Sequence, residues 1–280
     1  MNITVIGLGL IGGSIARDLK SQLNVVVYGV DASSEHCQMA LELKLVHEVV
    51  DLKQGLQKAD IIIISIPVDK IEGLLPQVLN SIHSTTTVVI DVGSTKSDIC
   101  AAIRYHPQRG RFVAAHPLAG TEFSGPTAAM KGLFQNKKNI VCDRQYSDPD
   151  ALDTAMRLFE SIGLTTTFMT PEEHDKHLAY VSHLSHVSSF MLGLTVLDIE
   201  KDEKQIFDLA GTGFASTVRL AKSNPKTWSA IFSKNRKYLI EALDSYILHL
   251  QNFREQINTE NIAATEQLMS ASNEIKRILK

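Results

Sequence analysis

Two segments of the chain combine side chains that can carry out acid–base chemistry. One is His116–Gly125, with the sequence HPLAGTEFSG, and the other is Asp91–Lys96, with the sequence DVGSTK. Because imidazole titrates near neutral pH, His116 is able to accept a proton from a hydroxyl group while a hydride leaves the same carbon. A histidine before a proline also has structural uses. Lys96 can equally be a solvated loop charge or a cap for the helix that follows.

Both segments follow predicted strands of a parallel sheet. Short β-branched runs alternate with helix-like segments over the first 170 residues, which is typical of a sheet covered by helices on both faces. The isoleucines Ile61–Ile64 indicate a central strand buried on both faces. Since ligands collect at the carboxyl ends of such strands, both segments should open onto one site. The predicted strands are Ile3–Ile6, Val25–Val30, Ile61–Ile66, Thr87–Asp91, Phe112–Ala115, Asn139–Cys142 and Thr165–Met169.

The pattern changes after Met169. One more helix is predicted over residues 148–162, between the last two strands, and Thr170-Pro171-Glu172-Glu173 has the features of a helix start. From there to Lys280 the periodicity is helical. We therefore expect a doubly wound α/β domain over residues 1–170 and an all-helical domain over 171–280, whose apolar faces would suit a dimer interface. A packed monomeric core would explain the apolar helix faces as well as a dimer does.

The start of the chain has the spacing of a dinucleotide-binding turn. A G-x-G-x-x-G pattern comes directly after a predicted strand and before a predicted helix. In this pattern the first glycine permits a tight turn, the second lets the backbone approach a pyrophosphate, and the third allows close packing of helix on strand. A glycine-rich turn without a ligand is the other interpretation. The predicted cofactor-binding residues here are Gly7, Leu8, Gly9, Leu10, Ile11 and Gly12.

The acidic residue Asp31 favours a turn that binds a dinucleotide over a turn without a ligand. Asp31 ends the second predicted strand, 19 residues beyond Gly12, where a carboxylate binds the 2′-hydroxyl of a ribose. The same charge would repel a 2′-phosphate, so NAD is expected rather than NADP, although the nearby His36 weakens that preference. Ser65, Ile66 and Pro67 end the third strand at the same edge of the sheet and are also predicted to contact the cofactor, unless they form a simple strand exit.

Composition limits the other classes of function. The 280 residues carry 28 basic and 31 acidic side chains, which gives no electrostatic footprint for nucleic acid or for an anionic membrane surface. No apolar stretch is long enough to span a bilayer. The cysteines Cys37, Cys100 and Cys142 are odd in number and lack a CxxC pair, which favours a reducing, cytoplasmic setting. The first residues lack the basic leader of a secretory signal.

Four histidines raise the question of a metal. His183 and His186 are three residues apart and so share one helix face, and His174 and His177 repeat that spacing. Two imidazoles lack the third ligand of a usual zinc site, and the H-E-x-x-H pattern is missing from the sequence. Substrate contact or helix packing is therefore the preferred interpretation, and no metal is expected.

The combined motifs closely resemble the prephenate dehydrogenase family, which includes the arogenate dehydrogenases of tyrosine biosynthesis. The resemblance extends from Ile3 to about Arg236. It rests on the glycine pattern, the Asp91–Lys96 and His116–Gly125 segments, Ser182-His183-Leu184-x-His186, Gly211-Thr212-Gly213-Phe214, Arg219-Leu220-Ala221 and Pro225-x-x-Trp228.

The resemblance implies a reaction and a set of residues. Prephenate would be oxidised and decarboxylated to 4-hydroxyphenylpyruvate with reduction of NAD, in a cytoplasmic homodimer that pairs through its helical domain. His116 would polarise the ring hydroxyl and Ser94 would help to hold it. Arg219 would bind a carboxylate through its planar guanidinium group. The other residues expected in the substrate site are His183, His186, Glu122 and Trp228, although Glu122 can equally cap a helix and Trp228 can be a core aromatic.

Other functions stay open at this point. An arogenate dehydrogenase would use His116, Ser94 and Arg219 in the same way, because the hydride leaves the ring and not the side chain. Hydroxyacid dehydrogenases and imine reductases also join a dinucleotide domain to a helical one, but the His116 segment argues against them. A non-catalytic NAD-binding dimer would need neither His116 nor Arg219.

Overall fold

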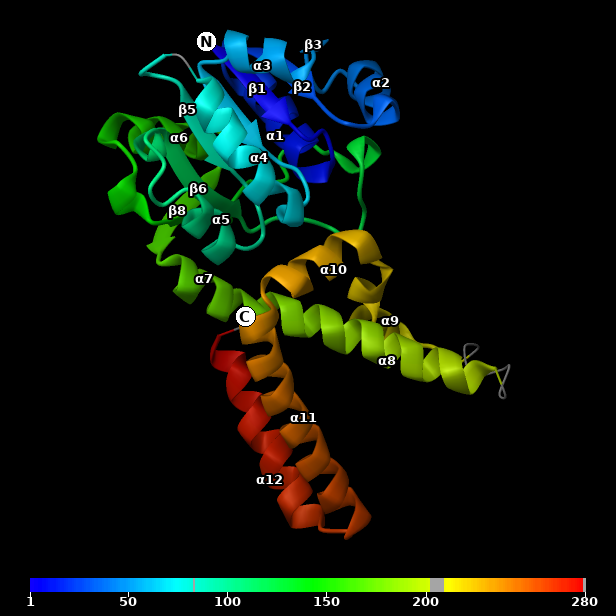
Figure 1. Ribbon diagram of the computed structural model, residues 1–280. Helices are drawn as coiled ribbons and strands as arrows, with labels where there is room; N and C mark the ends of the chain where they lie inside the picture. Colours follow the sequence, from blue (N-terminus) through cyan, green and yellow to red (C-terminus); the bar gives the residue numbers. More distant parts are fainter. Residues whose placement is uncertain (83, 202–208, 279–280) are drawn as a thin grey trace. The chain divides into compact units, whose positions relative to one another are not determined.

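The computed structural model describes residues 1–82, 84–201 and 209–278 (Figure 1). The chain forms two compact units, Met1–Asn235 and Arg236–Lys280. The first unit holds a large sheet and the helices around it, and the second is helical.

The sheet has eight strands in the order β3-β2-β1-β4-β5-β6-β7-β8. All neighbouring strands are parallel except β6 and β7, which are antiparallel. The strands are β1 Asn2–Ile6, β2 Val26–Val30, β3 Glu48–Val49, β4 Ile61–Ile64, β5 Val88–Asp91, β6 Phe112–Pro117, β7 Lys137–Cys142 and β8 Leu164–Met169. The seven predicted strands are therefore confirmed to within two residues at each end.

Two features of the sheet were not predicted. Strand β3 contains only two residues, which is too short for a periodicity to show. Strand β7 reverses direction because the connection from β6 contains a 3-10 turn, Pro126–Ala128, and no crossover helix. That connection, residues 118–136, packs this turn against α1 and α2.

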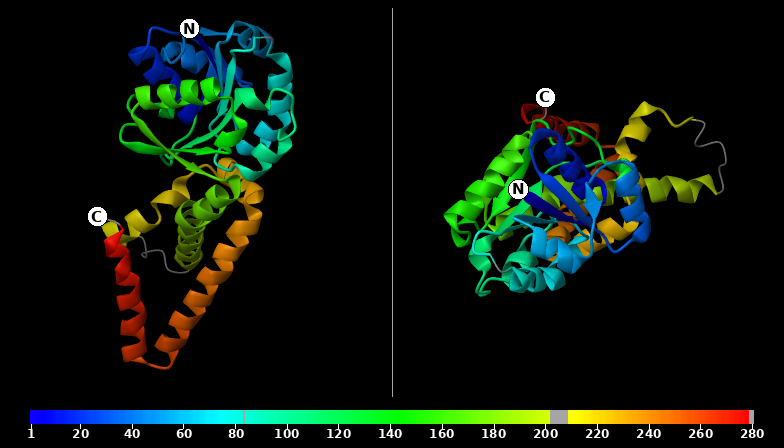
Figure 2. Two further views of the ribbon diagram at one scale, coloured as in Figure 1. Left: turned by 90° about the vertical axis from the view of Figure 1, so that its left-hand side faces the viewer. Right: turned by 90° about the horizontal axis from the view of Figure 1, so that it is seen from above.

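Helices cover both faces of the sheet, and each face has its own apolar core. One core contains Ile61 and Ile63 together with side chains from α1, α2 and α6. The other contains Ile62 and Ile64 with side chains from α3, α4, α5 and α7. Strand β4 is thus buried on both faces, as its four isoleucines predict. In the left view of Figure 2, α6 (green) and α4 (cyan) lie on opposite sides of the sheet. The helices are α1 Leu10–Gln22, α2 Ser34–Glu42, α3 Leu52–Lys58, α4 Val68–Ser81, α5 Ser97–Ala102 and α6 Pro149–Ser161.

The chain leaves the sheet through a helix with a well-defined start. Helix α7, Pro171–Leu178, has a complete capping box in which Thr170 and Glu173 satisfy each other's backbone N–H groups. A π-helical turn, Ala179–His183, joins α7 to α8, Leu184–Glu200. Such wide turns are frequent at functional sites because they shift the side chains relative to the regular helix face. The first unit continues with α9 Thr212–Thr217, a 3-10 turn at Arg219–Lys222, and α10 Pro225–Lys234.

The second unit is a helical hairpin. Helix α11, Arg236–Asn258, and helix α12, Ile262–Ser272, pack against each other and are followed by a 3-10 turn, Asn273–Arg277 (Figure 2). Asn261 caps α12 through its side-chain oxygen, which accepts the N–H of Ala264 at 3.1 Å. None of the described helices has both the length and the apolarity to cross a membrane.

Candidate active site

The glycine turn packs against the end of β4 and leaves one face open. Gly7 has a φ of +96°, and a Cβ there would lie 2.2 Å from the carbonyl oxygen of Ser65. A Cβ at Gly12 would lie 1.9 Å from the carbonyl oxygen of Gly7. Gly9 differs, because a Cβ there would meet no atom within 4 Å. The open space lies at the start of α1, whose free N–H groups favour an anion, so these residues fit the pyrophosphate of a dinucleotide.

The remaining predicted cofactor residues gather around this turn. Asp31 follows β2, and its carboxylate accepts the N–H of Leu8 at 2.8 Å and that of Ser33 at 2.9 Å. His36 Nδ1 lies 3.4 Å from the same carboxylate. Asp31 keeps 12% of its side chain exposed, so an oxygen can still accept a ribose hydroxyl. Ser65, Ile66 and Pro67 follow β4 directly, and Ser65 borders both Gly7 and Gly12.

His116 lies in β6 and is held by a second histidine. Its Nδ1 is 2.8 Å from Nε2 of His174, and Nδ1 of His174 is 2.8 Å from a carboxylate oxygen of Asp175. His174 and Asp175 are buried on α7. Burial lowers the pKa of His116 well below its usual 6.5, and His174, Lys96 and His183 lower it further. A neutral imidazole is the form that can accept a proton.

His183 is held so that its proton lies on Nε2. The side-chain nitrogen of Asn235 lies 2.7 Å from the carbonyl oxygen of Asp175, so it is the donor end of the amide. The same nitrogen lies 3.0 Å from Nδ1 of His183. Nδ1 must therefore accept, which leaves the proton on Nε2. Burial lowers the pKa of His183 to about 4, so the ring stays neutral near pH 7 and presents an N–H donor.

His186 and Trp228 pack against each other. Their rings are stacked with centroids 3.3 Å apart, and the ring of His183 meets Trp228 edge-on at 6.0 Å. Nδ1 of His186 donates to the carbonyl oxygen of Ser182 at 3.0 Å. Three of the predicted substrate residues therefore lie together, because Trp228 contacts both His183 and His186.

Lys96 is fully buried, so its interpretation as a solvated loop charge is wrong. Its ammonium group forms an ion pair with Asp91 and donates to the carbonyl oxygen of Ala115 at 2.8 Å. Burial raises the pKa of Asp91, and the ammonium group of Lys96 counteracts that rise. Because Ala115 precedes His116, this pair ties the β5–α5 loop to the strand that carries the histidine. Ser94 lies in the same loop and is half-buried.

Arg219 pairs with Glu122 instead of lying free. A guanidinium nitrogen is 3.0 Å from the Glu122 carboxylate, and 52% of the Arg219 side chain is exposed. The hydrogen bond from its own backbone and the pairing with Arg219 lower the pKa of Glu122. A helix cap, the alternative role for Glu122, is therefore not what the structure shows.

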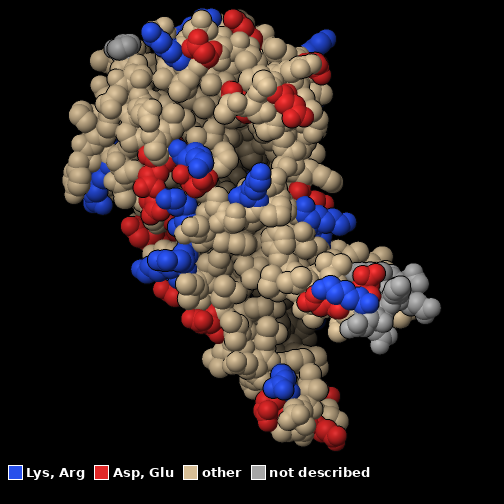
Figure 3. Space-filling view, turned by 45° about the vertical axis from the view of Figure 1, so that its right-hand side comes forward, with Lys and Arg blue, Asp and Glu red and all other residues tan. Residues whose placement is uncertain are grey.

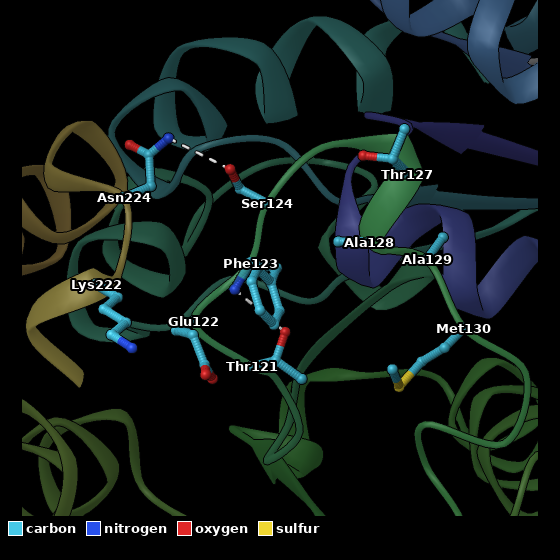
Figure 4. A pocket seen from close by; sticks show the side chains of 10 residues that line it. All are labelled: Thr121, Glu122, Phe123, Ser124, Thr127, Ala128, Ala129, Met130, Lys222 and Asn224. Carbon is cyan, nitrogen blue, oxygen red and sulfur yellow. Dashed lines mark hydrogen bonds between the residues drawn. The ribbon is translucent and has the colours of Figure 1, made fainter. Parts of the chain in front are cut away.

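Glu122 also borders a cavity of about 640 Å³. Figure 4 shows Lys222 and Asn224 on one side of it and the β6–β7 connection on the other, with a 3.4 Å hydrogen bond between Asn224 and Ser124. Its lining residues are Thr121, Glu122, Phe123, Ser124, Thr127, Ala128, Ala129, Met130, Lys222 and Asn224.

The face shown in Figure 3 does not carry charges of one sign alone. On the face shown in Figure 3, Lys and Arg side chains are interspersed with Asp and Glu side chains. Among the described residues there is also no cluster of three or more His, Cys, Asp or Glu side chains with the arrangement of a metal site.

Sequence reasoning missed three residues of this arrangement. His174 was noted only for its spacing to His177, and Asp175 and Asn235 were not singled out. The capping box at Thr170 fixes where α7 begins, which was the available signal for placing His174 and Asp175 in its first turns. The contact between His174 and His116 spans 58 residues, and no local pattern reports such a contact.

Known families match the sequence over most of its length. The model of the nucleotide-binding domain of prephenate dehydrogenase matches residues 15–167, and that of its dimerization domain matches residues 170–271. The chain belongs to the prephenate dehydrogenase family. The expected resemblance, and with it the sheet domain followed by a helical part, is confirmed.

Individual members of the prephenate dehydrogenase family give the same result. The prephenate dehydrogenase of Bacillus subtilis is 31% identical over 266 residues, which cover 93% of this chain and 72% of the relative. The structure of A. aeolicus prephenate dehydrogenase in complex with hydroxyphenyl propionate and NAD+ is 28% identical, with a TM-score of 0.87 over 99% of this chain and 97% of that one. Synechocystis arogenate dehydrogenase is 29% identical, with a TM-score of 0.78 and complete coverage of both chains. The expectation of an NAD-dependent oxidoreductase of the prephenate dehydrogenase family is confirmed.

Proposed function

We propose that this chain converts prephenate to 4-hydroxyphenylpyruvate and carbon dioxide with reduction of NAD, and that His116 accepts the proton of the ring hydroxyl. The observation that supports it most is the His116 ring, which is neutral and held through Nδ1 near the carboxyl end of β6. The glycine turn and Asp31 lie at the carboxyl ends of strands in the same sheet.

The proposed chemistry assigns each residue one task. NAD, when bound, supplies the carbon that accepts the hydride. His116 takes the hydroxyl proton at Nε2, which builds the carbonyl character that expels the hydride. Ser94 helps to orient that hydroxyl. Loss of the ring carboxylate as carbon dioxide then makes the ring aromatic, so the protein has mainly to position and polarise the substrate.

The carboxylates of the substrate would bind on the other side of the site. We propose that Arg219 exchanges its partner Glu122 for a substrate carboxylate, because its exposed planar guanidinium group can form two charge-assisted hydrogen bonds. His183 would donate from Nε2, and the stacked pair of His186 and Trp228 would bound the pocket. The cofactor would be held by Gly7–Gly12, Asp31 and Ser65–Pro67.

Arogenate is the second candidate substrate, because the chain is also similar to the arogenate dehydrogenase of Synechocystis. It differs from prephenate by an amino group in place of the keto group of the side chain. Steady-state rates with each substrate, each offered with NAD and with NADP, distinguish the candidates. We expect the highest kcat/KM for prephenate with NAD, and a higher kcat/KM for arogenate would contradict the assignment of prephenate as the substrate.

The organisation of the chain is part of the proposal. We propose a boundary between residues 170 and 171, with a helical part that binds substrate and pairs two copies into a homodimer. The match to a dimerization domain and the exposed apolar side chains of α8, α11 and α12 support the pairing. The cysteines Cys37, Cys100 and Cys142 are free, which agrees with a proposed cytoplasmic location.

The glycines of the turn should separate cofactor binding from folding. In Gly9→Ala, we expect NAD affinity to fall at least tenfold, while stability changes by less than about 1 kcal/mol because the new methyl group meets no protein atom. In Gly12→Ala the methyl group would overlap the backbone of Gly7, so folding itself should suffer. Isothermal titration with NAD and thermal unfolding of both variants test this. Unchanged NAD affinity in Gly9→Ala would place the pyrophosphate elsewhere.

The carboxylate of Asp31 should determine the choice of cofactor. We expect Asp31→Ala to raise the KM for NAD about 10- to 100-fold, because it removes the ribose contact and the acceptor for the Leu8 N–H. The KM for NADP should change far less, since the variant also loses the charge that repels a 2′-phosphate. Initial rates at saturating prephenate give both constants, and equal changes for the two cofactors would refute the assignment.

A further inference from the structure

Three side chains from two distant segments form a continuous hydrogen-bonded row. His116 contacts His174, His174 contacts Asp175, and both distances are 2.8 Å. We propose that His174 and Asp175 are positioning residues that fix the proton of neutral His116 on Nδ1, so that Nε2 is the basic nitrogen. This inference rests on the proposed role of His116 and goes beyond it by stating which ring nitrogen accepts the proton and what determines this.

The direction of each hydrogen bond follows from Asp175. An ionised carboxylate can only accept, so the contact with His174 requires a proton on Nδ1 of His174. Neutral His174 then has a lone pair on Nε2, and that nitrogen can only accept from His116. The Nδ1 of His116 must therefore carry the proton, and its Nε2 has a free lone pair.

Asp175 is held firmly enough to determine which nitrogens of His174 and His116 carry protons. One carboxylate oxygen accepts the backbone N–H of Lys96 and the other accepts that of Ser97, each at 2.8 Å. Only 2% of the residue is exposed. Burial alone would raise the pKa of Asp175, but the hydrogen bonds from His174 and Ser97 lower it below 3.8, so the group is ionised near pH 7. A charged acceptor with three donors cannot rotate without losing them.

The same row stabilises the positive charge that forms during the reaction. When Nε2 takes up the substrate proton, the imidazolium of His116 faces His174, Lys96 and His183. His174 in turn faces Asp175, Lys96 and Asp91. Since Lys96 is paired with Asp91, Asp175 is the remaining anion of the row and can offset the new charge through His174.

The position of the proton can be measured without substrate. Nitrogen-15 NMR of the histidine-labelled holoenzyme, with His116→Asn used to assign the signal, reports which ring nitrogen carries the proton. We expect a protonated Nδ1 for His116 in the parent chain and a change in this signal in His174→Phe. A protonated Nε2 in the parent would overturn the inference, whatever the enzyme does with prephenate, so its failure is distinguishable from failure of the proposed function.

Paired substitutions at His174 separate positioning from packing. His174→Phe fills the space but removes the acceptor, whereas the amide oxygen of His174→Gln can still accept from His116 Nδ1. We expect kcat to fall about 10- to 100-fold in the phenylalanine variant, with NAD affinity unchanged, and to recover most of that loss in the glutamine variant. His177→Phe on the exposed face of the same helix is the matched control and should leave kcat unchanged.

The pH profile gives a readout that a purely structural role would not move. In Asp175→Asn the imidazolium of His116 loses its compensating anion, so the acidic limb of kcat/KM should move to lower pH while kcat falls. Any of three results would overturn the inference. The first is a parent value of kcat in His174→Phe, and the second is an equal loss of kcat in both His174 variants. The third is an acidic limb that does not move in folded Asp175→Asn.

Discussion

Replacement of His116 by Asn should lower kcat by about 10²- to 10⁴-fold, which is the usual contribution of a positioned general base. The amide of asparagine cannot take up the hydroxyl proton, so the carbonyl character that expels the hydride would have to develop without help. Because His116 lies in β6 and not in the glycine turn, NAD affinity should stay at the parent value. Steady-state kinetics with prephenate, together with titration of NAD, give both quantities.

The control for this substitution is His249→Asn, which removes an exposed histidine from α11 in the other unit. It should have parent kinetics. Parent kcat in folded His116→Asn would show that His116 does not accept the proton. A loss confined to NAD affinity would place His116 in the cofactor site instead.

Replacement of Lys96 by Met should have the largest effect on stability. It leaves the carboxylate of Asp91 buried without its cation, and removing one partner of a buried ion pair costs about 3–5 kcal/mol. This is a large part of the total stability of a typical protein, about 5–15 kcal/mol. The substitution also frees the carbonyl oxygen of Ala115, next to His116, so activity should fall in the molecules that remain folded. Urea unfolding measures the change in stability.

The stability lost in Lys96→Met should depend on pH in a defined direction. Burial holds the pKa of Asp91 above its ordinary 3.8, and in this variant no cation counteracts it. At a pH below this ordinary pKa, Asp91 is protonated in both the folded and the unfolded chain, so the loss of stability is smallest there. It grows as the pH rises from that value through the pKa of the folded state, because the unfolded chain then releases the proton more easily.

A second substitution tests whether the unpaired charge of Asp91 causes the loss of stability. Asp91→Asn combined with Lys96→Met removes both charges and should recover most of the lost stability and its pH dependence. Lys58→Met removes the cation of a surface pair with Glu48, 3.6 Å away, and should cost less than about 1 kcal/mol. A deficit in Lys96→Met as small as that of Lys58→Met would show that the buried pair does not hold the β5–α5 loop.

Local sequence patterns were sufficient to predict most of the strands of the sheet. Ile61–Ile64 predicts a strand buried on both faces because each side chain is apolar, and the structure places these residues alternately in the two cores. The glycine spacing and Asp31 are adjacent in the fold because a βαβ unit brings the ends of β1 and β2 together. The reversal of β7 was not predictable in this way, because β-propensity does not report strand direction.

The substrate side of the site was harder to predict. Arg219 could be named from a motif, but its ion pair with Glu122 joins residues 97 positions apart. Lys96 looked the same as any loop lysine until its partner Asp91 and its complete burial were known. Asn235 fixes the proton of His183 through a contact across 52 residues. Hydrogen-bond partners of this kind depend on tertiary packing, which single-sequence periodicity does not contain.

In the proposed reaction this chain couples hydride transfer to decarboxylation. Simultaneous measurement of NADH formation and carbon dioxide release, with the purified chain, prephenate and NAD, tests it most directly. We expect equal amounts of both products in the parent chain, and the same proportion at a much lower rate in His116→Asn. NADH without carbon dioxide, or neither product from a folded chain that binds NAD, would contradict it.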